Sequence, residues 1–451
     1  MGRAPMATQD TIAAVATAPG RSAIGIIRVS GPGASAVAAS LVKKRLPARR
    51  AVFTEFLDAE GTAIDQGLAL FFPGPHSYTG EDVLELHGHG GAVVLRMLLE
   101  RCIGLGARLA EPGEFTRRAF LGGKLDLAQA ESVIDLIDAA TSAAARSAMR
   151  SLSGSFSARI EELTSELVEL RALVEATLDF PDEEIDIVHR ADAEARLARV
   201  RNKLDLVLDA ARQGSVLREG LSVVLAGRPN VGKSSLLNRL AGEDLAIVTD
   251  IPGTTRDPIR EVIDVNGVPL RIVDTAGLRD PRDPVEELGI DRTWSAIRNA
   301  DAVVLVIDAT RGETSADREI LERLPPAQLR VRVINKIDLV SRQPDVEQNG
   351  NDYTVWLSAK TGEGMELLRD TLLEGVGWHG APEGVFLARA RHIEALRRAS
   401  GHLASAEQAL SQPEIFAEEL RCAHEALGAI VGEFTPDDLL GEIFSRFCIG
   451  K

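Results

Sequence analysis

The sequence predicts a chain of several domains, in which an α/β domain with a parallel sheet is inserted into an all-α domain that follows an α+β domain. Three observations predict this fold class. Short β-like runs rich in Gly and Pro fill residues 1–122, and long Ala/Leu/Glu/Arg segments with helical spacing fill residues 123–218 and 381–451. Between 219 and 380, strands alternate with loops and helices. Because the helical pattern resumes after this region, we expect the two helical halves to pack together.

The bulk composition is that of a globular protein. The chain has 451 residues, of which 45% are hydrophobic and 26% charged. This length corresponds to roughly two to four domains. The formal net charge of −16 argues against binding nucleic acid by bulk electrostatics, although a local basic face or a basic partner subunit stays open.

The cysteines and the apolar segments bear on the cellular compartment. Cys102, Cys422 and Cys448 lie far apart and form no disulfide pattern, which predicts a reducing environment. The N-terminal segment lacks the apolar run of a signal peptide, and no stretch approaches the length of about 18 apolar residues that a membrane span needs. The sequence therefore predicts a cytoplasmic protein with no membrane association.

The first region combines strand and helix patterns. The runs IGIIRVSG (24–31), GLALFFPG (67–74) and DVLELHGHGG (82–91) predict strands. The segment VVLRMLLERCIGLG (93–106) has helical spacing. These residues therefore predict an α+β domain.

The next regions differ in the period of their apolar residues. AQAESVIDLIDAATSAAARSAMRSL and IEELTSELVELRALVEATL have the three- and four-residue spacing of amphipathic helices, and PDEEID (181–186) predicts a turn after them. Further along, LSVVLAG, PLRIVDT, AVVLVIDAT and RVRVINKID are each typical of a buried parallel strand that leads into a loop. The loops at these strand ends carry the chemistry.

The loop after the first of these strands has the features of a phosphate-binding loop. Residues 227–234 read Gly-Arg-Pro-Asn-Val-Gly-Lys-Ser and precede the apolar helical segment SSLLNRL, which is the context the motif requires. Glycines let backbone N–H groups turn toward phosphates, and the N-terminus of the next helix adds positive potential. Lys233 can reach the β- and γ-phosphates, and the Ser234 hydroxyl can bind Mg²⁺.

Three further motifs at strand ends indicate a guanine nucleotide. Asp274 begins Asp-Thr-Ala-Gly, in which the carboxylate can hold the Mg²⁺ shell and the Gly277 N–H can sense the γ-phosphate. Asp338 ends Asn-Lys-Ile-Asp (335–338), and its carboxylate can accept hydrogen bonds from N1–H and the exocyclic amine of guanine. Adenine has an acceptor at N1, so this pairing selects GTP. Ser-Ala-Lys (358–360) supplies the loop beneath the base, and together the motifs predict a GTP hydrolase.

The complete predicted GTP site extends over the segments that surround these motifs. Its residues are Asn230, Val231, Gly232, Lys233, Ser234, Ser235, Thr249, Asp250, Ile251, Pro252, Gly253, Thr254, Thr255, Asp274, Thr275, Ala276, Gly277, Asn335, Lys336, Asp338, Ser358, Ala359 and Lys360. Leu278 follows the Asp-Thr-Ala-Gly motif, where small Ras-like switches have a glutamine that orients the attacking water. Because leucine cannot orient water, another group must do so and neutralise the developing charge.

Several segments resemble one family. GRPNVGKSS, TDIPGTTRD (249–257), DTAGLRD, GEFTRRAFLGGKLDLAQAE (113–131) and the terminal FCIGK (447–451) closely resemble the MnmE (TrmE) family of bacterial tRNA modification GTPases. The resemblance covers essentially the whole chain. It implies an α+β tetrahydrofolate-binding-like N-terminal domain, a discontinuous all-α helical domain and an inserted Ras-like α/β P-loop G domain.

The same resemblance implies that K⁺ and dimerisation promote hydrolysis. The family forms homodimers through its N-terminal domain, and its G domains meet when K⁺ is bound. The implied K⁺ ligands are Asn230, Thr249, Ile251 and Thr254, and the implied Mg²⁺ ligands are Ser234 and Thr255.

The implied catalytic residues are Lys233 at the phosphates and Glu286, which would act on the catalytic water through a bridging water. Glu287 is adjacent, so the register between the two glutamates stays open. From the residue types alone, Asn230 suits either a hard cation or a turn, and Glu286 suits a solvated helix start.

The resemblance further implies a one-carbon chemistry. Arg28, Glu85, Lys124 and Lys451 match positions around a 5,10-methylene- or 5-formyl-tetrahydrofolate. With an FAD-containing partner, MnmG, the dimer would form a heterotetramer that installs an aminomethyl or carboxymethylaminomethyl group on C5 of the wobble uridine of certain tRNAs. From the residues alone, Arg28 and Glu85 could instead be exposed strand residues.

Other interpretations stay open at this point. Cys448 is a conceivable nucleophile or a packing residue, and His87 and His89 fit either a metal site or a tight Gly-rich turn. A regulatory GTPase of the ribosome-assembly type would carry a basic RNA-binding module, which this acidic sequence does not show. A general K⁺-stimulated NTPase of metabolism would differ by lacking folate binding.

Overall fold

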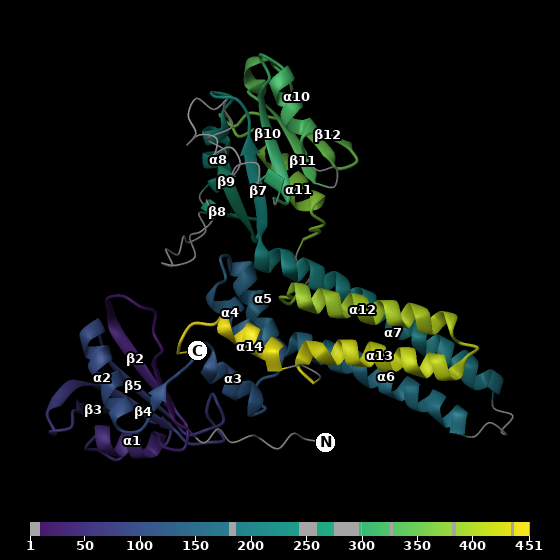
Figure 1. The fold of residues 1–451 in the computed structure, drawn as a ribbon. Helices are drawn as coiled ribbons and strands as arrows, with labels where there is room; N and C mark the ends of the chain where they lie inside the picture. Colours follow the sequence, from purple (N-terminus) through teal and green to yellow (C-terminus); the bar gives the residue numbers. More distant parts are fainter. Residues whose placement is uncertain are drawn as a thin grey trace. The chain divides into compact units, whose positions relative to one another are not determined.

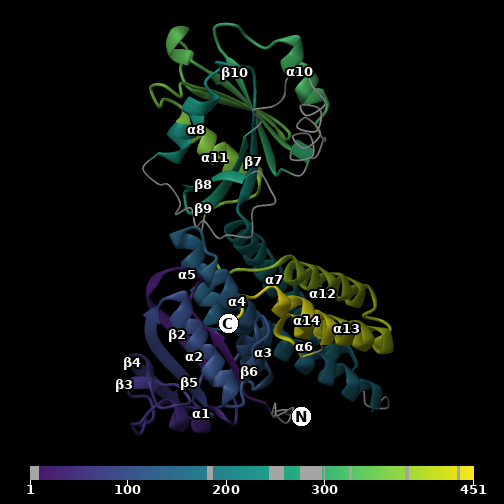
Figure 2. The same ribbon diagram turned by 60° about the vertical axis from the view of Figure 1, so that its left-hand side comes forward.

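Figures 1 and 2 show the computed structural model of the chain, which describes residues 10–179, 186–242, 259–274, 297–298, 300–324, 328–380, 385–433 and 437–450. The chain divides into two units. Unit 1 comprises Met1–Ile134 with His424–Lys451, and unit 2 comprises Asp135–Ala423. Unit 1 therefore draws on two segments that are far apart in the sequence.

Unit 1 contains a six-stranded sheet with two helices on one face. The strand order is β3-β4-β5-β2-β1-β6, and neighbouring strands are antiparallel except for β1 and β6. The strands are β1 (Ile12–Val15), β2 (Ser22–Ser30), β3 (Val52–Leu57), β4 (Ala63–Phe72), β5 (Val83–Gly90) and β6 (Arg108–Leu109). The helices are α1 (Ala34–Leu41) and α2 (Ala92–Gly104).

The alternation of side chains along β2 explains which face the helices cover. Ile27 and Val29 are fully buried and share a core with Leu98 of α2, because successive side chains of a strand point to opposite faces. Ile26, which precedes Ile27, and Arg28, which lies between Ile27 and Val29, are only half-buried and belong to the opposite face. The strands and the helix that the sequence predicts in this region are confirmed as β2, β4, β5 and α2.

The last helix of the chain packs against helices that follow the sheet. α3 (Glu114–Leu121), α4 (Leu127–Ile137) and α14 (Asp437–Ser445) surround a core that includes Leu127 and Phe444. Beyond α14, Ile449 forms an isolated antiparallel bridge with Pro112. The end of the chain therefore returns to the sheet-bearing part of unit 1.

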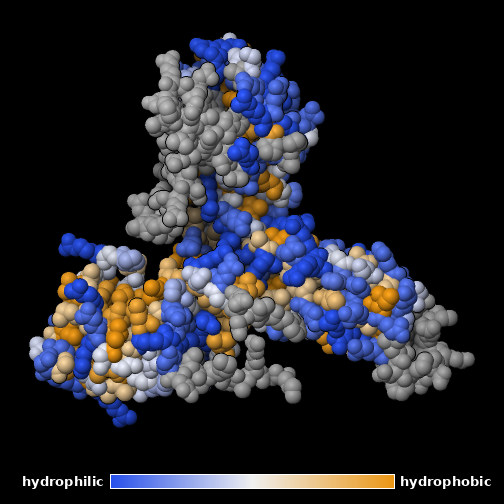
Figure 3. Space-filling view, viewed as in Figure 1, coloured by the Kyte–Doolittle hydropathy of each residue, from blue (hydrophilic) through white to orange (hydrophobic). Residues whose placement is uncertain are grey.

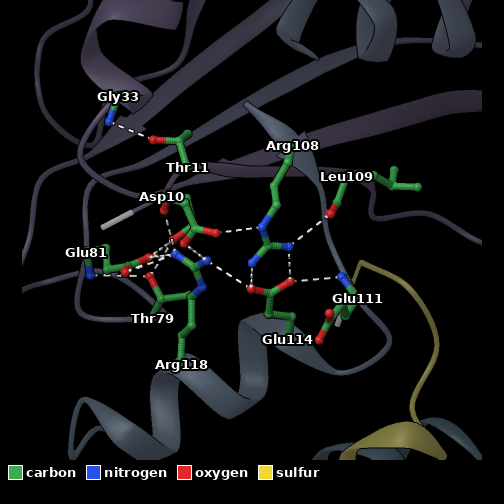
Figure 4. A network of polar contacts seen from close by, with 11 residues as sticks. Asp10, Thr11, Gly33, Thr79, Glu81, Arg108, Leu109, Glu111, Glu114 and Arg118 are labelled. Carbon is green, nitrogen blue, oxygen red and sulfur yellow. Dashed lines mark hydrogen bonds and ion pairs between the residues drawn. The ribbon is translucent and has the colours of Figure 1, made fainter. Parts of the chain in front are cut away.

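A charge network around the buried Arg118 ties the start of the described chain to α3 (Figure 4). The Arg118 side chain is 3% exposed and forms ion pairs with Asp10 (2.9 Å), Glu81 (3.1 Å) and Glu114 (2.9 Å). Arg108 pairs with Asp10 and Glu114, at 2.5 Å each. The hydrogen bond from Arg108 lowers the pKa of Asp10. Burial would raise the pKa of Glu114, but hydrogen bonds from Arg108 and Arg118 outweigh it and lower that pKa.

The helices of unit 2 come from both sides of the α/β region. They are α5 (Ser142–Leu152), α6 (Ser155–Asp179), α7 (Asp186–Glu219), α12 (Ala390–Gln408) and most of α13 (Pro413–Val431). α7 packs against both α6 and α12. The Phe156 ring of α6 stacks on Phe386, which precedes α12, at a centroid distance of 4.4 Å. These contacts confirm that the two helical halves pack together.

The α/β region of unit 2 forms a seven-stranded sheet of order β12-β13-β11-β10-β7-β9-β8. The inner strands are parallel, and the edge strands β8 and β12 are antiparallel to their neighbours. The strands are β7 (Leu221–Ala226), β8 (Ile259–Val265), β9 (Val268–Asp274), β10 (Ala302–Asp308), β11 (Leu329–Asn335), β12 (Asp345–Asn349) and β13 (Asp352–Leu357).

This sheet has helices on its faces, which explains its apolar central strands. The helices are α8 (Lys233–Ala241), α10 (Ser315–Glu322) and α11 (Met365–Gly375), with the short 3₁₀ helix η1 (Ile337–Leu339) after β11. Every residue of β10 is buried, as expected for a strand covered on both faces. The four parallel strands that the sequence predicts are confirmed as β7, β9, β10 and β11. None of the described helices has a stretch long and apolar enough to cross a membrane.

Candidate functional site

The loop between β7 and α8 has the backbone of a phosphate-binding loop. Gly227, Asn230 and Gly232 have φ angles of 138°, 65° and 102°, a region open to glycine and tolerated by asparagine. A Cβ at Gly227 would lie 2.5 Å from the Val306 carbonyl oxygen, and one at Gly232 would lie 2.3 Å from the Asn335 amide nitrogen. Both glycines are therefore required by close packing beneath the loop.

Lys233 lies at the start of α8 and points back across this loop. Its Nζ donates hydrogen bonds to the carbonyl oxygens of Gly227 (2.6 Å) and Arg228 (3.1 Å). Ser234 and Ser235 follow in the first turn of the helix, and both are exposed. The loop thus presents an ammonium group, hydroxyl groups and a helix N-terminus together, which is a set of groups suited to a polyphosphate and its metal ion.

Asn335 ties three loops of the site together. Its side chain is buried, and its Nδ2 donates to the Val231 carbonyl oxygen at 2.8 Å. Its Oδ1 accepts hydrogen bonds from the backbone N–H groups of Lys336 (2.8 Å) and Ala359 (2.9 Å). The predicted site residue Asn335 therefore links the loop after β7 to the loop after β13.

Lys336 and Asp308 form a second connection to the phosphate loop. The Lys336 Nζ donates to the Asn230 carbonyl oxygen at 2.8 Å and pairs with Asp308 at 2.6 Å. Burial alone would raise the pKa of Asp308, but hydrogen bonds from Lys336 and Thr310 outweigh it and bring the pKa to about 2. Sequence reasoning missed Asp308, although a carboxylate at the end of a fully buried strand is a signal for a site residue.

Asp338 is oriented by Ser358. The Ser358 hydroxyl donates to Asp338 Oδ1 at 2.7 Å and accepts from the Thr361 N–H at 3.2 Å. A carboxylate can accept several hydrogen bonds. Beyond the one from Ser358, Asp338 therefore keeps acceptor capacity for the N1–H and amine of a guanine. Lys360 is exposed, and its carbonyl oxygen accepts from Arg239 at 2.7 Å. The structure thus brings the motifs at 227–234, 335–338 and 358–360 to one end of the sheet.

Part of the predicted site lies outside the described residues. These positions are Thr249, Asp250, Ile251, Pro252, Gly253, Thr254, Thr255, Thr275, Ala276, Gly277, Leu278, Glu286, Glu287 and Lys451. The backbone of Asp274 is described, and it ends β9 opposite Leu225 of β7. β9 therefore delivers Asp274 to the same end of the sheet at which β7 leads into the phosphate loop.

A second polar cluster lies on the open face of the unit 1 sheet. Arg28 of β2 and Glu85 of β5 are register partners, and their side chains pair at 2.9 Å. His87 Nε2 lies 3.0 Å from the other Glu85 oxygen. Burial would raise the pKa of Glu85, but the hydrogen bond with His87 and the charge of Arg28 outweigh it and lower that pKa. Arg28 and Glu85 are therefore in direct contact across the two strands.

Aromatic rings and the chain end complete this cluster. The Arg28 guanidinium lies 5.6 Å from the Tyr78 ring centroid and 5.8 Å from that of Phe115. Burial raises the pKa of Tyr78, whose hydroxyl hydrogen-bonds Thr116 at 2.8 Å. Arg28 also donates to the Gly450 carbonyl oxygen at 3.4 Å. Sequence reasoning missed Tyr78, Phe115 and this contact between residues 422 positions apart.

The remaining candidates have simpler surroundings. Lys124 is exposed, and its side chain runs past Gly80. Cys448 is exposed, and its carbonyl oxygen accepts from the Gly113 N–H at 3.4 Å. His89 pairs with Asp65 at 2.7 Å. Among the described residues, no group of three or more His, Cys, Asp or Glu side chains is arranged to hold a metal ion, which gives the metal interpretation of HGHGG no support.

The sheet order and the convergence of these loops define the class of protein. A parallel sheet with a Gly-X4-Gly-Lys-Ser loop after β7 and an Asn-Lys-Ile-Asp motif after β11 is the architecture of a P-loop GTP-binding protein.

Comparisons with known proteins define the family. The family model described as the MnmE helical domain matches residues 127–448, and the one described as the GTP-binding protein TrmE N-terminus matches residues 11–124. A tRNA modification GTPase MnmE of Chromobacterium violaceum is 59% identical over 445 residues, which are 98% of this chain and 99% of that protein. A tRNA modification GTPase MnmE of an Azoarcus species is 58% identical over 443 residues, or 98% of each chain.

Among solved structures, the Aquifex aeolicus Era protein bound to GDP·AlF₄⁻, in a variant form, is 26% identical. The matched region covers 40% of this chain and 66% of the Era chain, with a TM-score of 0.28. The two family models and the near-complete relatives show that the chain belongs to the MnmE (TrmE) family, and it is a GTPase. The fold class that the resemblance implied is confirmed.

Proposed function

We propose that the chain is a K⁺-stimulated GTPase that acts with an FAD-containing MnmG partner. Together they modify C5 of the wobble uridine of certain tRNAs with an aminomethyl or carboxymethylaminomethyl group. The observation that carries this proposal is the match, over nearly the full length of both chains, to relatives that are named tRNA modification GTPases. GTP hydrolysis would drive dimerisation of the G domains and a conformational cycle.

The phosphate loop supports binding of GTP with Mg²⁺. The positive φ angles of Gly227, Asn230 and Gly232 turn backbone N–H groups toward the region that Lys233 crosses. Mg²⁺ would be held by Ser234 together with Thr255, and it would neutralise charge on the transferred phosphate. The exposed Ser234 hydroxyl in the first turn of α8 fits this role.

Asn230 supports a K⁺ site beside the phosphates. Its side chain is exposed on the loop, and its carbonyl oxygen is fixed by Lys336 at 2.8 Å, so the backbone under the amide is held in place. Thr249, Ile251 and Thr254 would supply the other oxygen ligands, and Glu286 would act on the water that Leu278 cannot orient. Equal hydrolysis rates in K⁺ and Na⁺, or retained K⁺ stimulation in Asn230→Ala, would contradict this part of the proposal.

The Arg28 cluster supports a tetrahydrofolate derivative as one-carbon donor, in its 5,10-methylene or 5-formyl form. An ionised Glu85 can accept hydrogen bonds from the N–H groups of a pterin ring, and the rings of Tyr78 and Phe115 offer flat apolar contacts. Lys124 and Lys451 would contribute positive charge for the carboxylates of the folate tail. Isothermal calorimetry with 5-formyl-tetrahydrofolate, on the full chain and on Glu85→Gln, tests this site.

Apolar side chains on α2 support a homodimer formed through the N-terminal domain. Val93 and Met97, one helical turn apart on α2, are 60% and 43% exposed. Figure 3 shows apolar residues gathered over this part of unit 1. An apolar surface of this kind is typical of a face that another subunit covers.

We place the domain boundaries at 1–122, 123–218, 219–380 and 381–451. We also place the protein in the cytoplasm.

The proposed function is tested by complementation. A bacterium that lacks its own MnmE receives this chain, and bulk tRNA nucleosides are analysed by mass spectrometry. We expect wobble-uridine modification to return with the wild-type chain and to stay absent with Lys233→Ala. Modification that remains absent with a folded, GTP-hydrolysing wild-type chain in the presence of MnmG would overturn the proposal.

A further inference from the structure

A strongly basic segment stands out in this acidic chain. Five of the eight residues from Lys43 to Arg50 are Lys or Arg, and the run VKKRLPARRAVF around them contains no acidic residue. The whole chain has a net charge of −16, so a polyanion is repelled on average and can be held only where cations are concentrated. We call residues 43–50 the basic segment.

The basic segment is exposed but held in a defined conformation. All five cationic residues are exposed. The Arg49 N–H donates to the Phe71 carbonyl oxygen at 2.8 Å, and the Arg49 side chain donates to the His76 carbonyl oxygen. Arg49 also has a φ of 59°, which costs free energy in a residue that has a Cβ. The neighbouring Ala48 forms a bridge with Phe71.

The charges of the segment are poorly neutralised by the protein itself. Lys43 lies 3.8 Å from Glu55, with both side chains more than half exposed, and such pairs contribute little. Lys44 donates to the Phe53 carbonyl oxygen at 2.9 Å. Within the described part of the chain, no ion pair to a carboxylate is found for Arg45 or Arg50. The segment therefore presents cationic groups to a partner.

An aromatic ring lies directly beyond the basic segment. Phe53 of β3, the edge strand of the sheet, is 59% exposed. An exposed ring next to arginines and lysines is the combination that binds unpaired nucleotides, because bases stack on the ring while phosphates meet the cations. A loop of this kind, without an amphipathic helix, does not match the usual membrane-surface pattern.

Strand register connects Phe53 with the polar cluster around Arg28. Phe53 is the register partner of Leu68 on β4, and Leu68 is the partner of His87 on β5. Register partners share a face of the sheet, so Phe53 lies on the face that carries His87 and Glu85. β4 lies between β3 and β5, so these two strands are about 10 Å apart. A nucleotide held at Phe53 is therefore close to the cluster in which we place the one-carbon donor.

We infer that the basic segment and Phe53 form the surface that binds tRNA through an unpaired loop. Lys43, Lys44, Arg45 and Arg50 contact phosphates, and Phe53 stacks on a base. This inference rests on the proposed function, since it identifies where the RNA substrate of that function is held.

The test compares two triple variants of the full chain. Lys43→Gln, Arg45→Gln and Arg50→Gln remove three charges but keep Lys44 and Arg49, which donate to backbone carbonyl oxygens. The matched control, Arg199→Gln, Arg397→Gln and Arg398→Gln, removes three exposed charges from α7 and α12. Binding of tRNA is measured by fluorescence anisotropy at several salt concentrations, with GTP hydrolysis and thermal unfolding as folding controls.

We expect the first variant to bind tRNA about tenfold or more weakly, with the slope of log K against log salt reduced by about 2 to 3. The control variant should stay within about twofold of the wild-type chain. Phe53→Leu should weaken binding of an anticodon stem-loop by about fivefold or more without changing the salt slope, and Phe53→Tyr should retain binding.

Three results would overturn the inference. One is equal binding by the two triple variants, and another is absence of tRNA binding by the folded wild-type chain. The third combines two findings: the first triple variant loses as much heparin binding as tRNA binding, and Phe53→Leu has no effect. This result would indicate general attraction of polyanions. The proposed function is judged separately by the nucleoside analysis of complemented cells, so the two failures are distinguishable.

Discussion

The hydroxyl group of Thr141 donates a hydrogen bond to the carbonyl oxygen of Gly267 at 2.7 Å. The Thr141 hydroxyl oxygen also accepts from the Ala144 N–H at 3.1 Å and so caps the start of α5. Gly267 lies in the turn between β8 and β9, where a Cβ would come within 2.9 Å of the Ala143 side chain. One hydroxyl thus joins a helix start to the strand pair that flanks residues 243–258 and 275–296.

This contact predicts that Thr141→Val destabilises unit 2. Valine keeps the shape of threonine but removes both the helix cap and the donor to Gly267, so the free energy of unfolding should fall by about 1 to 2 kcal/mol. Urea unfolding measures the change. Thr141→Ser retains the hydroxyl and should recover most of the loss; an equal loss in Ser and Val would show that the methyl group, and not the hydrogen bond, matters.

Asp338 predicts a change of base specificity. An asparagine at this position offers one acceptor and one donor, which complements the N1–H and the C2 carbonyl of xanthine instead of the amine of guanine. We expect Asp338→Asn to lose GTP affinity by at least about tenfold and to gain affinity for xanthosine triphosphate, measured with fluorescent nucleotide analogues. Ser358→Ala removes the hydrogen bond that orients the carboxylate and should weaken GTP binding without this gain. Unchanged GTP preference in Asp338→Asn would place the base elsewhere.

The network in Figure 4 predicts a strong and pH-dependent loss of stability in Arg118→Met. Removing the buried guanidinium takes a cation from Asp10, Glu81 and Glu114, of which Asp10 and Glu114 keep Arg108, and the expected cost is about 3 to 5 kcal/mol. In the wild-type chain the lowered pKa values of Asp10 and Glu114 give stability that is present above their ordinary values and lost as the pH falls.

The difference between Arg118→Met and the wild-type chain should therefore be larger at pH 7 than at pH 4. Thermal unfolding at the two pH values checks this expectation. Arg446→Met, which removes an exposed arginine paired with Glu442, is the matched control and should have little effect. A constant difference between Arg118→Met and the wild-type chain across this range would contradict it.

The sequence predicted those parts of the fold and site that depend on local pattern. β10 is a continuous apolar run up to Asp308, and β11 buries alternate residues and ends at Asn335 of the Asn-Lys-Ile-Asp motif, so strand and site were found together at β11. The edge strand β12 (DVEQN) is polar and β6 has two residues, so neither gives an apolar pattern. The roles of Asp308 and of the Arg28–Gly450 contact depend on which distant segments meet, and residue spacing does not encode this.

Asp308 predicts an acid-dependent contribution to stability. Its pKa of about 2 lies below the ordinary value of 3.8, so the stabilisation is fully present above about pH 4 and is lost as the pH falls toward 2. Asp308→Asn should be less stable than the wild-type chain above pH 4, and the difference should shrink toward pH 2. Urea unfolding between pH 2 and 5 measures it. The exposed Asp370→Asn has the same charge change and should show no such convergence.

Gly450 predicts that the end of the chain needs a residue without a side chain. Its φ is 99°, and a Cβ would lie 2.3 Å from the Val15 carbonyl oxygen. We expect Gly450→Ala to displace this segment and to speed amide exchange at Gly113, whose N–H donates to Cys448. Gly441→Ala, in α14 with no atom within 4 Å of the new Cβ, should leave this exchange unchanged. Slow exchange at Gly113 in Gly450→Ala would mean that the segment stays docked.

The contribution of α14 and Ile449 to unit 1 has a consequence for synthesis of the protein in the cell. The core between α3, α4 and α14 and the bridge between Pro112 and Ile449 join early residues to residues that are synthesised hundreds of positions later. The strands of unit 1 therefore leave the ribosome hundreds of residues before the helix that completes their unit. During this interval Leu127 and Phe120 lack the α14 side chains that cover them in the folded unit, and apolar surface exposed in this way promotes aggregation until α14 is made.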